Sequence, residues 1–511
     1  MRMSVSVGTV LLTLGLLFPA AARAQEGTQQ QDARAELEAL KKRVAELEAR
    51  QNAQDDSLRK AVERLSEPTS PTDFHTSWNW HNGLRFETAD KAFSLHLGAV
   101  IQYDAEWFHT GSGIQKYQAP TMTSALGNQA DGDEIRRLRL ISDGTIYSNT
   151  FYRLEVDFAG RVNSAIQSNV AAGKAATATA VTSGDVVQID RAYIGTTAFQ
   201  PFATVTVGHI VEPFNLETVT NSDFITFMER AVTFTFAPQY QTGILLSNAV
   251  VDQRVTWAIG EFRPQFGTDN SGASYQGYEK NNSGYDTTAR VTGLPWYQDE
   301  KTGGTFGLLH LGAAADLLTG AQPNSPVEFS SAPEMHLASA FVDTGAMSHI
   351  EDYQLYDEEA AFVYGPFSAQ GEWAQAGMAR TSGQGKDLTF NAVYGYISYF
   401  LTGEHRGYSK ANGCFDRVDV LHNLGSNKDG RRGWGAWELA LRYSYIDLDS
   451  ENVHGGRMAD VTAGMNWYLN SNVRFMMNYV HSKVLENTAA AGTPGRGGNE
   501  DILGLRLQMD L

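Results

Sequence analysis

Side chains that could do chemistry are spread thinly along this chain of 511 residues. The sequence contains no HExxH zinc motif, no phosphate-binding P-loop, no GxSxG nucleophile motif and no GxGxxG motif after a strand. Its single cysteine, Cys414, can form neither an intramolecular disulfide nor a Cys/His metal cluster. Histidines and carboxylates stand singly between apolar neighbours. We therefore expect neither an enzyme active site nor a cofactor.

One acidic run could bind a cation. The segment Asp447-Leu-Asp-Ser-Glu451 brings carboxylates close together, and oxygen ligands of this kind suit Ca²⁺. An acidic turn explains the same run without a metal, and this is the interpretation that we favour.

The charges divide the chain into two parts. The sequence carries 58 acidic and 40 basic residues, which gives a formal net charge of −18. The signal and the helical segment before residue 73 are balanced between the two signs, so the acidic excess falls in residues 73–511. We expect no nucleic-acid partner for such a chain.

The N-terminus has the pattern of an export signal. Arg2 supplies the positive charge, residues 5–17 form a short apolar stretch, and Ala22-Arg23-Ala24 is an A-x-A cleavage site. We expect residues 1–24 to be a signal peptide and the mature chain to begin at Gln25. A single transmembrane anchor is the alternative, although the apolar stretch is short for one.

Residues 34 to about 66 have the heptad spacing of a coiled coil. Two rows of residues recur every seven positions and form the predicted seam: Leu37, Val44, Gln51, Leu58 and Leu65, and Leu40, Leu47, Gln54 and Ala61. We expect residues 25–72 to be a periplasmic coiled coil, which could oligomerise, followed by a linker rich in proline and serine. A single solvated helix is the alternative.

From about residue 74 onward, apolar and polar residues alternate with period two. In residues 93–107 the odd positions are apolar or aromatic, and the even positions are mostly polar. The same pattern recurs at 152–158, 437–445, 461–469 and 503–511. An apolar face with aromatic ends and a polar opposite face is typical of a transmembrane β-barrel. We predict an all-β transmembrane barrel of about 16 antiparallel strands over residues 73–511; the alternative is a soluble β-sandwich or a soluble barrel.

Several blocks in this region resemble one family of outer-membrane channels, the phosphate-selective porin O and P family. They follow one another in family order over about residues 80–511: 134–140 with 151–158, 189–194 with 207–217, 227–230, 289–296, 370–372, 399–404, 435–445 and 466–470. The resemblance implies a 16-stranded barrel in the bacterial outer membrane, assembled as a homotrimer. It also implies a loop that folds inward to narrow each pore, and passage of anions such as phosphate.

The resemblance also implies which residues form the constriction. Arg136 and Arg137 match an arginine pair of the family, Arg230 matches the arginine of its ME/LER motif, and Asp190 matches an acidic partner in the pore. Arginine suits this role because its planar guanidinium binds phosphate oxygens in pairs. The alternatives are structural: Arg136 and Arg137 could pair with Glu155 or Asp157, and Arg230 with Glu229 or Glu212 to lock the inward loop. Asp190 could equally be a structural partner of an arginine.

The chain departs from the family where further arginines are expected. Residues 313–350 contain no arginine or lysine, and Val100 and His209 stand at two other positions of pore arginines. An acidic barrel also does not attract anions by its overall field. We therefore carry three hypotheses: an anion porin, a general or organic-solute porin with weak ion preference, and an envelope tether that uses the coiled coil. The expected partners are outer-membrane lipid, lipopolysaccharide and small anionic solutes.

Overall fold

The computed structural model divides the chain into two compact units, Met1–Asp73 and Phe74–Leu511. In the first unit it describes a few helical residues between 38 and 51. In the second unit it describes residues 74–79, 83–118, 125–160, 187–263, 284–299, 304–319, 327–426, 432–485 and 497–511. The predicted signal peptide, the linker and all seam positions except Gln51 lie outside the described residues. Among the described residues, no helix has the length and apolar character of a membrane span.

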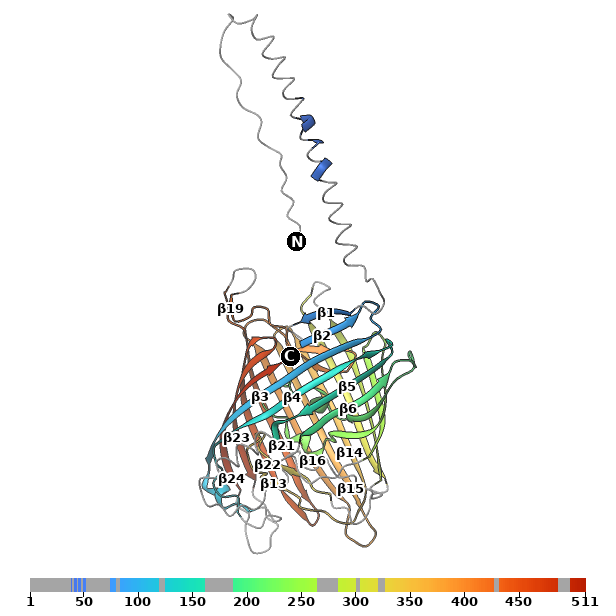
Figure 1. Cartoon of the computed structure of the whole chain (residues 1–511). Coiled ribbons are helices and arrows are strands. Elements are labelled where there is room, and N and C mark those ends of the chain that lie inside the picture. The colour runs from blue at the N-terminus through green and yellow to red at the C-terminus, as the bar shows by residue number, and fades with distance from the viewer. Residues whose placement is uncertain are drawn as a thin grey trace, which may run out of the picture. The chain divides into compact units, whose positions relative to one another are not determined.

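The second unit is a closed antiparallel β-barrel (Figure 1). The ring closes where the last strand, β24, pairs with β3, from Glu500 opposite Thr110 to Asp510 opposite Val100. Sixteen strands form the ring, which confirms the predicted fold. They are β3 (Ser94–Thr110), β4 (Gly132–Ile146), β5 (Thr150–Asp157), β6 (Gln188–Thr196), β7 (Thr204–Val211), β8 (Tyr240–Val250), β9 (Val255–Arg263), β10 (Tyr285–Gln298), β11 (Gly307–Thr319), β14 (Ile350–Tyr364), β15 (Phe367–Arg380), β16 (Leu388–Phe400), β21 (Ala436–Ser450), β22 (Val453–Asn470), β23 (Val473–Leu485) and β24 (Gly498–Asp510).

A hairpin of β1 (Phe74–Asn79) and β2 (Gly83–Thr88) extends the closure beyond the end of β24. β2 pairs with β3 over Ser94–Leu97, next to the part of β3 that β24 covers. The chain end is packed tightly here, because a Cβ on Gly98 would lie 2.5 Å from the carbonyl oxygen of Leu511. Glycine is therefore required for the close approach of β3 to the C-terminus.

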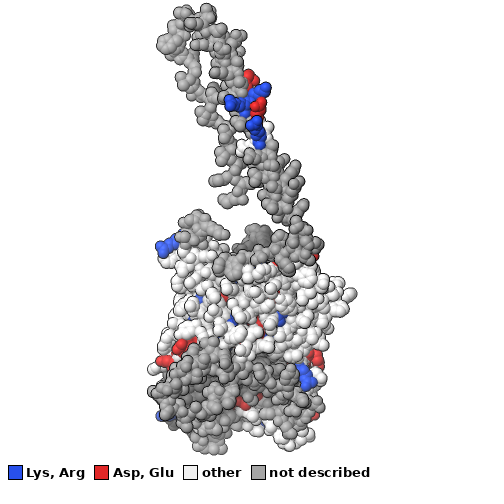
Figure 2. Space-filling view, viewed as in Figure 1, with Lys and Arg blue, Asp and Glu red and all other residues white. Residues whose placement is uncertain are grey.

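The two faces of the barrel wall reverse the usual distribution of polarity. Leu140 and Ile194 on the outer face are 59% and 63% exposed, whereas the charged side chains of Asp104 and Arg506 on the inner face are 0% exposed. Where Figure 2 shows described residues of the outer wall, most of the surface is uncharged and the charged areas at mid-height are small. An apolar outside and a charged inside suit a barrel whose outer wall contacts lipid.

Among the connections that the structure describes, three long ones enter the barrel. We call the end that carries Leu511 the terminal mouth and the opposite end the loop mouth. From the loop mouth come the β7–β8 loop, with α4 (Leu216–Val219) and the 3₁₀ helix η1 (Val232–Phe236), and the β11–β14 loop, with β12 (Ser330–Ser331) and β13 (Val342–Asp343). From the terminal mouth comes the β16–β21 segment, with β17 (Gly407–Ser409), β18 (Cys414–Asp416), β19 (Gly425–Ser426) and β20 (Arg432–Gly433).

The β7–β8 loop is anchored by an apolar cluster inside the barrel. Phe214, Val232 and Phe236 of this loop are buried together with wall residues such as Ile350 and Phe390. A short helix, α2 (Ser112–Lys116), follows β3 at the loop mouth. Burial of the three large apolar side chains of the β7–β8 loop fixes the backbone of that loop and so positions the polar residues at its tip.

The acidic run at 447–451 lies at the loop-mouth end of β21. Asp449 accepts a hydrogen bond from the backbone N–H of Gly456 and lies 3.4 Å from Arg457. Among the described residues, no group of three or more His, Cys, Asp or Glu side chains could hold a metal ion.

Candidate pore constriction

A β-bulge in β4 turns two neighbouring arginines into the barrel. The register between β3 and β4 shifts by one residue at Gln102, and Arg136 is the residue left without a cross-strand partner. In a regular strand one of two adjacent arginines would face the lipid, because side chains alternate between the faces. With the bulge, Arg136 reaches Glu229 and Arg137 reaches Gln102, both on the inside.

A second bulge does the same at Asp190. In the pairing of β5 with β6, Glu155 lies opposite Arg191 and the next pair skips Asp190. Asp190 and Arg191 therefore both face inward. Asp190 forms an ion pair with Nη2 of Arg139 at 2.6 Å. Nη1 of Arg191 lies 3.4 Å from the carboxylate of Glu155. Bulges recur beside functional sites because they re-aim side chains in this way.

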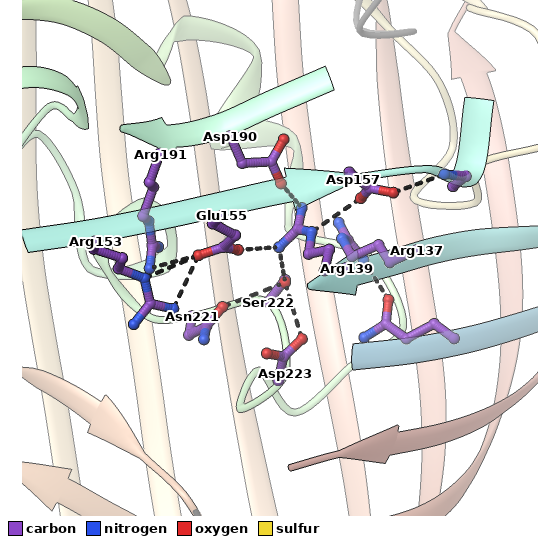
Figure 3. A network of polar contacts seen from close by, with 12 residues as sticks. Arg137, Arg139, Arg153, Glu155, Asp157, Asp190, Arg191, Asn221, Ser222 and Asp223 are labelled. Carbon is purple, nitrogen blue, oxygen red and sulfur yellow. Dashed lines mark hydrogen bonds and ion pairs between the residues drawn. The ribbon is translucent and has the colours of Figure 1, made fainter. Parts of the chain in front are cut away.

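Arg139 is the centre of the first charge network, which Figure 3 shows. Its Nε lies 2.9 Å from Asp157 and its Nη1 3.2 Å from Glu155, in addition to the contact with Asp190. Nη1 also donates to the hydroxyl of Ser222 in the β7–β8 loop at 3.3 Å. The guanidinium of Arg139 is thus surrounded by carboxylates and ties the loop to the wall.

A second network joins the tip of the β7–β8 loop to the barrel closure. Arg136 holds Glu229 through Nε at 2.9 Å and Nη2 at 3.1 Å. Arg506 on β24 holds Asp104 on β3 through Nε at 2.7 Å and Nη2 at 2.6 Å, and its Nη2 also lies 2.6 Å from Glu229. Burial alone would raise the pKa of Glu229, but Arg136 and Arg506 hold that pKa well below its usual range.

Arg230 lies in the same loop and bonds to the loop's own backbone. Its Nε donates to the carbonyl of Glu217 at 2.6 Å and its Nη2 to the carbonyl of Thr220 at 2.9 Å. The guanidinium also lies over the ring of Phe234, 4.9 Å from its centre. These contacts lock the loop, as the structural alternative predicted, but through carbonyls and not through the two acids expected. A role of Arg230 in the filter stays a prediction.

Arg137 differs from the other arginines of the constriction. Its Nη1 donates to the amide oxygen of Gln102 at 2.7 Å, and its Nε has no hydrogen-bond partner. Within the part of the chain that the structure describes, no carboxylate forms an ion pair with it. Arg137 is thus a buried cation beside two arginines that carboxylates hold, Arg136 and Arg139, and among the described residues it has no ion pair of its own.

Sequence reasoning missed the arginines that organise both networks. Arg139 and Arg506 were not singled out, although each stands at an inward position between two leucines of an alternating run. That position was the available signal. Glu155 and Asp157 were the partners that the structural alternative gave to Arg136 and Arg137. In the structure both carboxylates form ion pairs with Arg139.

Two positions at which the resemblance expects arginines lie on different faces of the wall. Val100 faces inward, opposite Arg139 on β4, and is 1% exposed. His209 lies opposite Thr242 on β8 and next in period to the exposed Val207, so it belongs to the outer face. An arginine at position 209 would therefore not reach the pore in this barrel.

Comparisons with known proteins give the family of this chain. The sequence model of the phosphate-selective porin O and P family matches residues 111–511. This chain belongs to that family. It is an outer-membrane porin, and both the family and the barrel are of the channel type.

The similarity to individual proteins extends over most of this porin. Porin O of Pseudomonas aeruginosa is 23% identical over 442 residues, which cover 78% of this chain and 85% of that protein. An uncharacterised protein of Caulobacter vibrioides is 28% identical over 454 residues, 87% of this chain and 79% of that protein. Among solved structures, an anion-selective porin from Comamonas acidovorans superposes with a TM-score of 0.45 at 11% identity, covering 82% of this porin and 100% of that chain.

Proposed function

We propose that this porin lets small anions diffuse across the outer membrane past the arginine-lined constriction of Arg136, Arg137 and Asp190, with Arg230 holding the inward loop. Three copies would assemble in a bilayer of lipid and lipopolysaccharide. The observation that supports this proposal most strongly is the state of Arg137, a buried guanidinium with no carboxylate partner among the described residues.

The field at the constriction depends on which arginines lack a carboxylate partner. Arg136, Arg139 and Arg506 are each neutralised by one or more carboxylates, so they contribute little net field to a passing ion. Arg137 keeps its charge in a low-dielectric wall, where a nearby charge acts more strongly than the distant net charge of the barrel. An anion at the constriction would supply the partner that Arg137 lacks.

A weakly selective porin for general or organic solutes is the second candidate. Twenty buried acidic residues stand against seven buried arginines among the described residues, and most of the constriction arginines are already neutralised. This balance favours a modest anion preference over strict phosphate selectivity. The expected relation of the N-terminal helix to envelope attachment stays a prediction.

The test is a single-channel reversal potential of the purified porin in a KCl gradient, with phosphate then added as a blocker. We expect the potential to indicate preference for chloride, and Arg137→Gln to lower the anion-to-cation permeability ratio on the order of fivefold, since one uncompensated charge is lost. Arg457→Gln, near the loop mouth, is the matched control. Cation preference of the unmodified porin would rule out the first candidate, and anion preference without phosphate block would support the second.

A further inference from the structure

The inner wall of the barrel is accessible on one side and filled on the other. On β14, β15 and β16 the inward side chains are buried, with exposed fractions of 5% or less at the level of the constriction: Asp357, Glu359, Ala361, Gln370, Glu372, Ala374, Ala392, Tyr394 and Tyr396. On β5 to β9 most of the inward residues toward the terminal mouth are partly exposed: Phe151, Arg153, Arg191, Tyr193, Thr204, Gly208, Gly243, Leu245, Ser247, Thr256 and Ala258. Gly195 and Thr206 on this side are buried.

The filled side is packed with the β16–β21 segment and the β7–β8 loop. Arg406 of the segment donates to Gln370 at 2.8 Å and to the hydroxyl of Tyr396 at 2.5 Å, both on the wall. Cys414 and Phe415 pack in one apolar cluster with Leu216 of the loop. Solutes that pass the constriction are therefore left with the side of the barrel formed by β5 to β9.

Most of that open wall is built from small residues, which leaves space for a solute. Glycine, threonine, serine and alanine make up most of the inward positions on β7, β8 and β9. The larger side chains on this side are concentrated in a four-residue patch on β5 and β6, which we call the open-wall patch: Phe151, Arg153, Arg191 and Tyr193.

The open-wall patch combines two partly exposed cations with two aromatic rings. Arg153 and Tyr193 are direct cross-strand partners, and the rings of Tyr193 and Phe151 meet edge to face with centres 6.3 Å apart. The side chains of Arg153 and Arg191 are 20% and 16% exposed. Arg153 is held by Glu155 through Nε at 3.1 Å and Nη2 at 2.9 Å. Among the described residues, Arg191 forms one ion pair, 3.4 Å from the Glu155 carboxylate, and its guanidinium lies 5.9 Å from the centre of the Tyr240 ring.

Arg191 has the weakest carboxylate contact of the three arginines around Glu155. Arg139 also pairs with Asp157 and Asp190, and Arg153 also lies 3.4 Å from Asp143. Among the described residues, the carboxylate contact of Arg191 is the one with Glu155, at 3.4 Å. A second anion beside Arg191 would therefore gain a charge-assisted contact at little expense to the existing network. Figure 3 shows Arg153 and Arg191 on the same side of Glu155, away from Arg137.

We propose that the open-wall patch is a second anion station that favours organic anions with a flat apolar body, such as aromatic carboxylates. Arg153 and Arg191 bind the carboxylate, and the rings of Tyr193 and Phe151 contact the apolar body. Inorganic phosphate gains nothing from the rings. This inference rests on the proposed anion conduction and adds a substrate class to it.

The experiment measures block of the chloride current in planar bilayers by benzoate and, separately, by acetate. We expect benzoate to reach half block at a concentration on the order of fivefold lower than acetate, as ring contacts of this kind allow. Tyr193→Leu should erase this difference and Tyr193→Phe should preserve it. Tyr443→Leu, a change on the outer face, is the control and should preserve it as well.

The role of the cations is tested with Arg191→Gln, which should weaken block by both anions on the order of tenfold. Equal block by benzoate and acetate in the unmodified porin would overturn the second station but leave anion conduction standing. A benzoate advantage that survives Tyr193→Leu would overturn it too. A cation-selective porin would overturn this inference together with the proposed function.

Discussion

Arg442 on β21 holds Glu334 of the β11–β14 loop with two hydrogen bonds, from Nε at 2.9 Å and from Nη2 at 2.5 Å. Its third nitrogen, Nη1, donates to the carbonyl of Glu229 in the β7–β8 loop at 3.1 Å. Both inward loops are therefore tied to the barrel wall through one guanidinium. We expect this residue to help set the size of the constriction, although it is not one of the residues that the family resemblance indicated.

Arg442→Gln should widen the channel and weaken the fold. Glu334 would keep its bonds from Ser444 and Thr462 but would lose its buried cation, a loss that costs about 3–5 kcal/mol in buried pairs. We expect a larger single-channel conductance and a lower midpoint of thermal unfolding by circular dichroism. Arg457→Gln at the exposed loop-mouth end is the control. Unchanged conductance in a folded Arg442→Gln porin would show that the loops are held by other contacts.

Arg139 and Arg137 should separate stability from selectivity. Arg139→Gln removes the ion pairs of Asp157 and Asp190, while Glu155 keeps Arg153 and Arg191, and we expect it to lower the free energy of unfolding by about 3–5 kcal/mol. Arg137→Gln removes one hydrogen bond to Gln102 and should cost about 1 kcal/mol. Urea unfolding followed by tryptophan fluorescence measures both. Equal losses would mean that Arg137 has a structural partner of similar weight.

The barrel could be predicted from sequence because lipid on one side and charge on the other impose a strict two-residue period. Predicted strands at 93–107, 437–445 and 461–469 coincide with β3, β21 and β22. The bulges were not placed in this way: an extra residue shifts the phase of the alternation by one position, and within one short strand the pattern alone does not separate such a shift from a polar residue on the outer face. The adjacent pair Arg136-Arg137 was a hint, because regular alternation would put one charge in lipid.

Long-range charge pairs were beyond the sequence for a different reason. Arg506 and Asp104 lie 402 positions apart, and only the closure of β24 on β3 brings them together. Likewise, nothing in the sequence near Arg442 indicates that a loop from β11 crosses the barrel to reach it. The candidate site was therefore predicted in residue type and region, but not in partners.

A charged side chain on the outer face should destabilise the porin most at the positions that are most exposed. Leu140 is 59% exposed on β4, between the inward Arg139 and Ile141. We expect Leu140→Arg to destabilise the porin in lipid by about 2–4 kcal/mol, as a basic residue near the bilayer midplane does. Unfolding by guanidinium in vesicles measures the loss, with Asp133→Lys near the strand end as the control. If Leu140→Arg left the free energy of unfolding unchanged, this face would contact protein or water and not lipid.

Cys414 reports on the β16–β21 segment, because it is the one cysteine of the chain and is buried against the wall. Arg290 holds this place closed: its Nη2 donates to the carbonyl of Gly413 at 2.8 Å while the same guanidinium pairs with Glu359 at 2.6 Å. We expect a water-soluble maleimide to label Cys414 slowly in the native porin, and Arg290→Gln to speed labelling on the order of tenfold, since loss of about 1.4 kcal/mol of closure gives that factor. Arg263→Gln, on the outer face beside Tyr285, is the matched control and should label at the native rate. Fast labelling of the native porin would mean that the segment already opens without the loss of Arg290.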